Sequence, residues 1–194
     1  MLQQEEVYNL FKQADALLDG HFLLTSGLHS PTYLEKFLVL QYPNTVERFC
    51  AELASRFADS GIEIVVGPTT GGVMLAYEVG KQLGVRGIFA ERGDNGGRVL
   101  RRGFKLRPGE RVLLVDDILT TGSSVRDTMQ VIEDAKAQLI GVAVLADRSG
   151  GKVDFGVRLE SLLKLDVQQY TAEECPQCAA AIPLTKRGSS LPPG

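Results

Sequence analysis

The stretch VLLVDDILTTGSSVRD, residues 112–127, places two adjacent carboxylates, Asp116 and Asp117, directly after a short apolar run. Carboxylates only accept hydrogen bonds, and the neighbouring hydroxyls of a ribose are donors. Successive side chains of a strand point to opposite faces, so the pair cannot hold one atom symmetrically inside a strand. Where the strand gives way to a loop, both carboxylates can reach a bound sugar. The pair therefore predicts a sugar-binding site.

Small polar residues follow the carboxylates: Thr120, Thr121, Gly122, Ser123 and Ser124. They precede a helix expected from about residue 123, whose free N–H groups and positive dipole end attract an anion. Gly122 lets the backbone approach closely, and the hydroxyls add donors without bulk. The alternative is that Ser123 or Ser124 only caps the helix and that the aspartates are solvated loop residues. Capping does not explain two acids after Leu-Leu-Val, so a 5-phosphorylated ribose is the predicted ligand.

The composition is that of an ordinary globular protein, with 194 residues, 44% hydrophobic and 23% charged. This length suits one main domain with a well-filled core. A formal net charge of -3 argues against the basic face of a nucleic-acid binder, so we expect no nucleic-acid partner. The charged N-terminus lacks the apolar core of a secretory signal, and no later stretch reaches membrane-spanning length. We expect a cytoplasmic protein with no membrane partner.

Three cysteines do not make a disulfide framework, which agrees with a reducing compartment. Cys175 and Cys178 form a CPQC pair that would supply half of a zinc site. No second pair exists, and the only histidines, His21 and His29, are far upstream. We therefore expect no direct metal ligand and interpret CPQC as a plain C-terminal turn with two free thiols.

Apolar runs from residue 62 onward alternate with helical patterns. The runs span 62–66, 86–91, 111–117 and 139–147, and the helical patterns span about 72–83 and 123–137. Short continuous apolar strands separated by helices indicate a parallel sheet covered on both faces. Ligands of such sheets bind at the carboxyl ends of the strands, where the two aspartates stand. The sequence predicts an α/β fold.

The flanking segments are less regular. Helical spacing of apolar residues predicts amphipathic helices at 2–18 and after Pro43, while 21–40 indicates extended structure broken by loops. Residues 93–110, rich in glycine and arginine, suggest an exposed hairpin or mobile loop. The last twenty residues, with CPQC, Pro183, Gly188 and a final Pro-Pro-Gly, indicate a loosely held tail.

The segment VLLVDDILTTGSS, residues 112–124, resembles the signature of the type I phosphoribosyltransferases, which bind 5-phosphoribosyl 1-diphosphate. It differs from the Walker phosphate loop, whose glycines precede a lysine that is absent here. The resemblance implies that the two acids hold the ribose hydroxyls and that residues 120–124 bind the 5-phosphate. The implied substrate-binding segment consists of Asp116, Asp117, Ile118, Leu119, Thr120, Thr121, Gly122, Ser123 and Ser124.

Other stretches are similar to the orotate phosphoribosyltransferases. They are DGHFLLTSGLHSPTYLE (19–35) for the N-terminal signature, VVGPTTGGVMLAYEVGKQLG (65–84) for the pyrophosphate side, FAERGDNGGRVLRRGF (89–104) for the catalytic loop, ADRSGG (146–151) for the orotate-binding arginine, and CPQCAAAIPL (175–184) for the bacterial C-terminus. The resemblance implies one phosphoribosyltransferase domain over 1–194, in which helices flank a mostly parallel sheet. A core of about 44–165 would carry a catalytic hairpin loop, and a hood of about 1–40 would be completed by the C-terminal segment.

The resemblance also implies an activity: phosphoribosyl transfer from 5-phosphoribosyl 1-diphosphate to orotate, giving orotidine 5'-monophosphate and pyrophosphate in de novo pyrimidine (UMP) biosynthesis. It implies a homodimer, and Mg2+ held through substrate and water near Asp117. The implied catalytic residues are Arg92, Arg101, Arg102 and Asp117. The implied pyrophosphate-side residues are Thr70 and Gly71, and the implied orotate-binding residues are Arg148, Tyr33, Leu34 and Thr120.

This chain departs from longer-loop members, which carry lysines where it has Thr25 and Gly71. Their catalytic loop also contains lysines and a histidine that residues 92–103 lack. The pattern resembles a short-loop bacterial branch, with Arg98, Arg101 and Arg102 as hypothetical replacement cations. The alternative for Arg101 and Arg102 is that they are solvated hairpin charges.

Rival interpretations of the function remain open at this point. A purine or uracil phosphoribosyltransferase shares the 112–124 motif but not the 19–35 segment. A non-catalytic regulator would keep the pocket as a sensor of 5-phosphoribosyl 1-diphosphate, and one acting on nucleic acid should show a basic surface. For Arg148 the alternative is an anchor for Asp147 or Asp116, and for Tyr33 it is a core position.

Overall fold

The computed structural model describes residues 1–24 and 26–186. In chain order the elements are α1 (Gln4–Gln13), β1 (Leu17–Leu23), β2 (His29–Leu34), α2 (Lys36–Leu40), α3 (Pro43–Arg56), a 3-10 turn (Ala58–Ser60), β3 (Ile64–Pro68), α4 (Gly71–Leu83), β4 (Arg86–Arg92), β5 (Arg98–Val99), β6 (Arg111–Leu119), α5 (Ser123–Asp134), β7 (Gln138–Asp147), β8 (Arg158–Lys164), α6 (Pro176–Ala179) and β9 (Thr185–Lys186).

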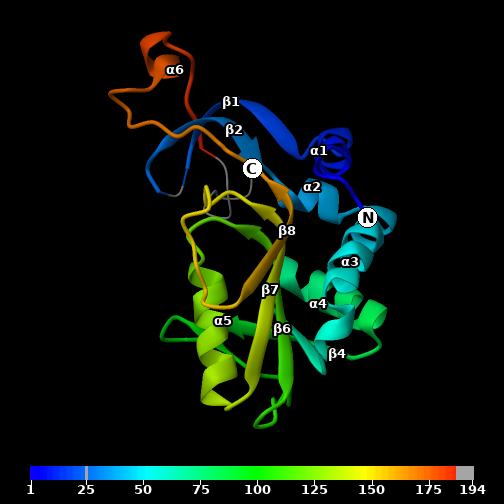
Figure 1. The fold of residues 1–194 in the computed structure, drawn as a ribbon. Helices are drawn as coiled ribbons and strands as arrows, with labels where there is room; N and C mark the ends of the chain where they lie inside the picture. Colours follow the sequence, from blue (N-terminus) through cyan, green and yellow to red (C-terminus); the bar gives the residue numbers. More distant parts are fainter. Residues whose placement is uncertain (25, 187–194) are drawn as a thin grey trace.

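The larger sheet has the order β5-β4-β3-β6-β7-β8. Its strands pair in parallel, except that β5 runs antiparallel to β4. The sheet lies between α5 on one side and α3 and α4 on the other (Figure 1). The predicted α/β fold with a mostly parallel, two-sided sheet is confirmed.

The alternation of side chains along β6 assigns each residue to one of two apolar layers. Leu113 and Val115 belong to the layer that includes α1, α3 and α4, whereas Val112 and Leu114 belong to the layer with α5. Period-two alternation over 112–117 then sends residue 116 toward α5 and residue 117 toward α4, and the order reverses at Ile118 and Leu119. The consequence for residues 116 and 117 is that their side chains leave the sheet on opposite faces.

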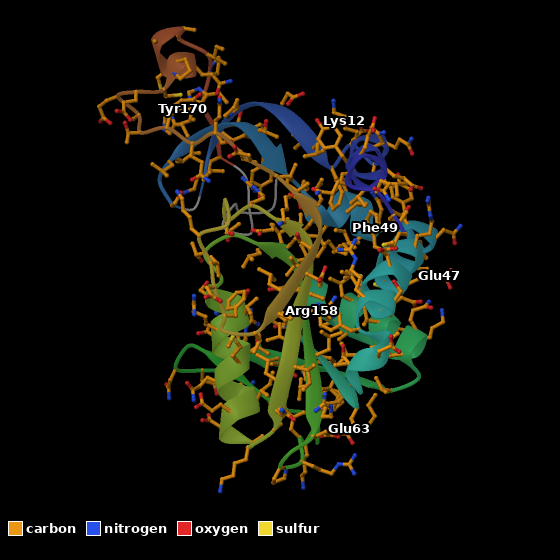
Figure 2. All side chains as sticks on the ribbon, in the orientation of Figure 1. Lys12, Glu47, Phe49, Glu63, Arg158 and Tyr170 are labelled. Carbon is orange, nitrogen blue, oxygen red and sulfur yellow. The ribbon has the colours of Figure 1, made fainter. Side chains whose placement is uncertain are left out.

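A second, three-stranded sheet with the order β2-β1-β9 lies above the carboxyl edge of the larger one (Figure 1). We call it the hood sheet. Strands β1 and β2 form an antiparallel hairpin, and β9 adds in parallel to β1. Helix α1 closes the base of the hood, where Phe11 stacks on Phe49 of α3 with ring centroids 5.6 Å apart (Figure 2).

The N-terminal prediction of one helix over 2–18 is wrong at its end. Helix α1 ends at Gln13, and Leu17 begins β1 instead of continuing the helical stripe. Asp15 adopts a left-handed φ of 52°, which stops the helix and turns the chain. The elements that were not predicted include α2 and β8, as well as the 3-10 turn, α6 and β9. In β8 charged residues interrupt the apolar ones, which hides a strand pattern.

The expectation of a loosely held C-terminal tail is wrong for the described part. Gln177 Nε2 donates to the Gly20 carbonyl at 2.8 Å, and the His21 ring nitrogen Nδ1 lies 2.8 Å from the Ile182 carbonyl oxygen. Strand β9 pairs with β1. Just before this tail, Tyr170 forms a backbone bridge to His29 beside the β1–β2 hairpin (Figure 2). Gly188 and the final Pro-Pro-Gly lie outside the described residues.

The expectation that the histidines are too remote from the cysteines is also wrong. The ligand atoms of His21, His29, Cys175 and Cys178 all lie within 4.8 Å of one another. Sequence separation was a poor guide because the C-terminal segment returns to pack on the hairpin. Among the described residues, no helix has the length and apolarity to cross a bilayer.

Candidate active site

The two aspartates of the 112–127 motif lie inside β6, which runs two residues further than expected, to Leu119. Their side chains accordingly have different partners. The Ser124 hydroxyl donates to Asp116 Oδ2 at 2.7 Å, on the α5 side. Lys36 Nζ donates to Asp117 Oδ1 at 2.9 Å, on the α4 side. The two acids therefore lie next to each other at the carboxyl edge of the sheet, but their side chains point to opposite faces.

Asp116 is a strongly perturbed carboxyl. Burial, and to a smaller extent the neighbouring Asp117 charge, raise its pKa to about 6. Hydrogen bonds from Ser124 and the Asp117 amide, with the more distant Lys36 charge, act in the opposite direction. Such a carboxylate gains from any additional hydrogen-bond donor, and sugar hydroxyls are donors of that kind.

The turn before α5 leaves its N–H groups available. Gly122 is the N-cap residue with a left-handed φ of 78°, and within residues 1–24 and 26–186 no side chain caps the helix. The alternative that Ser123 or Ser124 serves as a cap is therefore wrong; Ser124 binds Asp116 instead. Thr120, Thr121 and Ser123 are exposed beside these N–H groups. The arrangement can receive a phosphate.

The rest of this segment is structural. Leu119 is 1% exposed in the layer with α5, and Ile118 packs at the border of the layer with α4. A Cβ on Gly122 would lie 3.0 Å from Val153 Cγ1, so the turn packs closely against Val153. The side chains of Ile118 and Leu119 thus hold the turn, and only their backbone can face a ligand.

The predicted pyrophosphate loop reaches the same edge of the sheet. Thr70 is exposed at the start of α4, and Gly71 is buried. A Cβ on Gly71 would lie 1.8 Å from Asp117 Oδ2, so this position has no room for any side chain while Asp117 keeps its place. The glycine that replaces the lysine of longer-loop relatives is therefore a steric requirement here.

The loop arginines fall into two groups. Arg98 NH1 donates to the carbonyl and the hydroxyl of Thr69 at 3.0 and 2.8 Å, which ties β5 to the pyrophosphate loop. Arg101 pairs with Asp94, and Arg102 pairs with Glu91. These two pairs are at the surface, as expected for solvated hairpin charges. Arg92 ends β4 and is exposed.

The predicted orotate residues meet in part. Arg148 follows β7, and its amide donates to the Leu119 carbonyl at 2.8 Å. Burial lowers the pKa of Arg148, and the Tyr33 phenol acts in the opposite direction. Arg148 Nε is buried without a hydrogen-bond partner among the described residues, as expected of a group that awaits an anion. Leu34 is a core residue, so only its backbone can take part.

Lys36 is the site residue that the sequence did not reveal. It begins α2, directly after the SGLHSPTYLE stretch, and its amine reaches Asp117 across 81 positions of sequence. A lone lysine in an irregular segment has no spacing signal that would single it out. The hood thus provides a cation next to the core acids, whereas Thr25, at the position of a lysine in longer-loop relatives, lies outside the described residues.

Comparison with known proteins agrees with this geometry. The family model of the phosphoribosyl transferase domain matches residues 40–155. The orotate phosphoribosyltransferase of Pelotomaculum thermopropionicum is 50% identical over 97% of this chain and 98% of its own length. That of Caldanaerobacter subterraneus is 48% identical over the same shares.

Solved structures extend the likeness to the fold. The orotate phosphoribosyltransferase from Aeropyrum pernix has a TM-score of 0.69 and 25% identity, covering 82% of this chain and 93% of that chain. An adenine phosphoribosyltransferase from Thermoanaerobacter pseudethanolicus shares only the fold, with a TM-score of 0.58 and 18% identity over 69% and 88% of the two chains. With a carboxylate pair, a phosphate turn and close relatives over almost its entire length, this chain belongs to the orotate phosphoribosyltransferase family.

Proposed function

We propose that the chain transfers the phosphoribosyl group of 5-phosphoribosyl 1-diphosphate to orotate in de novo pyrimidine biosynthesis. The products are orotidine 5'-monophosphate and pyrophosphate. The observation that carries the proposal is the bond between Ser124 and Asp116, which joins a perturbed acid to the uncapped start of α5. This one feature combines acceptors for a ribose with donors for its phosphate, and it lies within the residues matched by the phosphoribosyl transferase family model.

The sugar phosphate is held by the protein in two parts. Asp116 and Asp117 accept hydrogen bonds from the ribose hydroxyls, while the N–H groups and hydroxyls of residues 120–124 bind the 5-phosphate. The bond from the anomeric carbon to pyrophosphate breaks as the bond from orotate nitrogen forms. The transition state resembles an oxocarbenium ion, so fixed positions and charges supply the catalysis.

The leaving pyrophosphate is the most negative fragment and requires cations. Thr70 and the N–H groups around Gly71 face it from the start of α4, and loop arginines approach from β4 and β5. Asp117 Oδ1 already accepts from Lys36 and from the Ile118 amide, and Asp117 would contact Mg2+ through a bound water. When bound, magnesium neutralises negative charge on pyrophosphate.

Orotate carries a carboxylate next to its ring. Arg148 has the fork of donors that grips a carboxylate, and its Nε is buried without a partner among the described residues. Tyr33 offers an aromatic face for the ring; it also packs against Phe22, with centroids 5.5 Å apart. Together these groups favour orotate over an uncharged base.

The experiment that tests the proposal mixes the protein with magnesium, 5-phosphoribosyl 1-diphosphate and one of four bases: orotate, uracil, hypoxanthine or adenine. Nucleotide and pyrophosphate are measured together. Formation of both with orotate alone supports the proposal. Turnover of another base in preference to orotate would reassign the enzyme, and tight binding of the sugar without turnover of any base would make it a sensor.

We also propose that the protein is a cytoplasmic homodimer, and that the hood and the core of each chain form a single domain. Large apolar side chains are exposed on the neighbouring helices α2 and α4 and just before α3, namely Phe37, Met74, Tyr77 and Tyr42. Tyr77 is 70% exposed, and burying such a patch in a second copy would remove it from water. Sedimentation of the wild type and of Tyr77→Glu tests the dimer: a monomeric wild type contradicts it.

A further inference from the structure

Four metal-binding side chains meet in the hood, outside the phosphoribosyl site. His21 lies on β1, His29 begins β2, and Cys175 and Cys178 flank the first turn of α6. His21 Nε2 lies 2.9 Å from His29 Nδ1, and Cys178 Sγ lies 3.2 Å from the same His29 nitrogen. His21 Nε2 lies 3.5 Å from Cys175 Sγ and 3.7 Å from Cys178 Sγ.

These separations approach those between the ligands of one tetrahedral ion. Zinc bonds of about 2.3 Å to sulfur and about 2.0–2.1 Å to nitrogen set neighbouring ligand atoms roughly 3.3–3.8 Å apart. The sulfur–nitrogen distances of 3.2, 3.5 and 3.7 Å need little change to reach this range. The two nitrogens need to separate by less than about half an ångström.

The hydrogen bonding around His21 selects a ligand form. Its Nδ1 lies 2.8 Å from the Ile182 carbonyl oxygen, which can only accept, so Nδ1 carries the proton. The lone pair of the neutral ring is then on Nε2, which faces His29 and the two thiols. A histidine that donates from one nitrogen to a carbonyl and binds metal through the other is the usual arrangement at metal sites.

The C-terminal segment lacks the apolar contacts that would otherwise hold it. Between residues 165 and 186, Cys175 is the only buried residue, and Ile182 and Leu184 are each 44% exposed. Gln177 Nε2 donates to the Gly20 carbonyl at 2.8 Å, which brings α6 against β1. A segment with so little apolar burial requires another source of stability, and small domains of this kind often use a structural metal.

We propose that His21 Nε2, His29 Nδ1 and the thiolates of Cys175 and Cys178 bind one Zn2+ that fastens the C-terminal segment to the hood hairpin. Two thiolates and two imidazoles are a donor set that suits tetrahedral zinc. All four positions are filled by the protein, which leaves no open position for a substrate and makes the site structural. Binding releases the thiol protons to solvent.

Zinc content tests this without reference to activity. Untagged protein, purified under reducing conditions without chelator and dialysed, is analysed for metal by mass spectrometry. We expect one zinc per chain in the wild type and a loss of most of it in Cys175→Ser and Cys178→Ser. Cys50→Ala removes the third cysteine, which is buried in α3, and should keep its zinc.

A second measurement covers the case in which the serine variants fail to fold. Zinc is removed from the wild type with a chelator and replaced by Co2+, whose absorption reports tetrahedral geometry and thiolate ligands. The metal-free protein should also be cut by trypsin after Lys164 at least about tenfold faster, because the segment beyond β8 is released. Zinc at well below one per chain after dialysis against Zn2+, equal zinc in the serine variants, or a Cys175–Cys178 disulfide in the reduced preparation would each overturn the proposal.

Discussion

Lys36 Nζ donates a hydrogen bond to Asp117 Oδ1 at 2.9 Å and so connects the hood to the acid pair of the core. The lysine side chain is 33% exposed and the aspartate side chain 4% exposed. A nearly buried carboxylate beside a second carboxylate requires a cation, and the hood provides it. Opening the hood would remove this charge, so the relative position of the two sheets affects the site directly.

Lys36→Met tests this link. Loss of the cation leaves Asp117 buried and unpaired, so we expect kcat/KM to fall at least about tenfold. Stability should fall by about 1–2 kcal/mol, less than for a fully buried pair because Lys36 is partly exposed. Lys81→Met is the matched control, since Lys81 forms an exposed ion pair with Glu47. Unchanged kcat/KM in Lys36→Met would contradict the role.

Asp116→Asn should stabilise the protein at neutral pH while abolishing activity. The folded pKa of Asp116, about 6, is above the ordinary value of 3.8, so the folded state binds this proton more tightly than the unfolded state. The charged carboxylate therefore destabilises the fold. This penalty is absent below the ordinary pKa of 3.8, grows as the pH rises to about 6, and is complete above that pH. Asparagine removes this penalty and keeps partners for Ser124 and the Asp117 amide.

Thermal unfolding at several pH values measures this effect. We expect Asp116→Asn to melt a few degrees above the wild type near pH 8, which corresponds to roughly 1–3 kcal/mol, and the gain to shrink toward pH 4. Asp127→Asn, an exposed change on α5, should show no such trend. A gain that is absent at pH 8, or that grows as the pH falls, would show that Asp116 is not penalised by burial.

Gly71→Ala should damage the acid pair without touching a charge. The added Cβ would lie 1.8 Å from Asp117 Oδ2, so either Asp117 or the start of α4 must move. Displacements of about 1 Å at a catalytic group reduce rates by about a hundredfold, and we expect a loss of that order in kcat. Circular dichroism checks folding. A variant with full activity would contradict this prediction, because it would show that Asp117 can move aside without loss of function.

The sequence predicted the elements whose signals are local. The apolar runs of β3, β4, β6 and β7 and the alternating helices were recognised because a two-sided sheet demands continuous apolar strands. The phosphate turn was recognised because its chemistry lies within nine residues, Asp116 to Ser124. That segment predicted phosphoribosyl transfer, whereas the choice of orotate also needed the resemblance of residues 19–35.

The features that could not be predicted from the sequence depend on contacts between distant segments. Lys36 reaches Asp117 only after the hood folds over the core, and no spacing rule records that approach. His21 meets Cys178 across 157 positions. Strand β8 lies at the edge of the sheet, and charged residues interrupt its leucines. It became evident as a strand only from its pairing with β7.

The loop arginines should differ in importance. Arg98 holds the carbonyl and hydroxyl of Thr69, whereas Arg101 pairs with the exposed Asp94 of its loop and Arg102 with Glu91 of β4. We expect Arg98→Ala to reduce kcat more than Arg101→Ala or Arg102→Ala. A loss under about tenfold in either of the latter, below about 1.4 kcal/mol of barrier, would exclude a catalytic role for that arginine. Equal losses in all three would contradict the distinction.

Arg148→Ala should weaken orotate binding selectively. The buried guanidinium has an Nε without a partner among the described residues, and a bidentate bond to the orotate carboxylate would satisfy it. Losing a buried charge-assisted pair costs about 2 kcal/mol or more, so we expect KM for orotate to rise at least about thirtyfold. KM for 5-phosphoribosyl 1-diphosphate should change little.

The matched control for this prediction is Arg158→Ala on β8, where the guanidinium lies over the Phe57 ring and pairs with Glu160 (Figure 2). It removes an arginine of the same size far along the sheet, and KM for orotate should not move. Arg148→Lys keeps the charge but loses the planar fork, so it should rescue the alanine variant only in part. An unchanged KM for orotate in Arg148→Ala would show that Arg148 does not bind the orotate carboxylate. Arg148 would then only anchor the end of β7. The backbone hydrogen bond from residue 148 to the Leu119 carbonyl does not depend on the side chain and would remain in the variant.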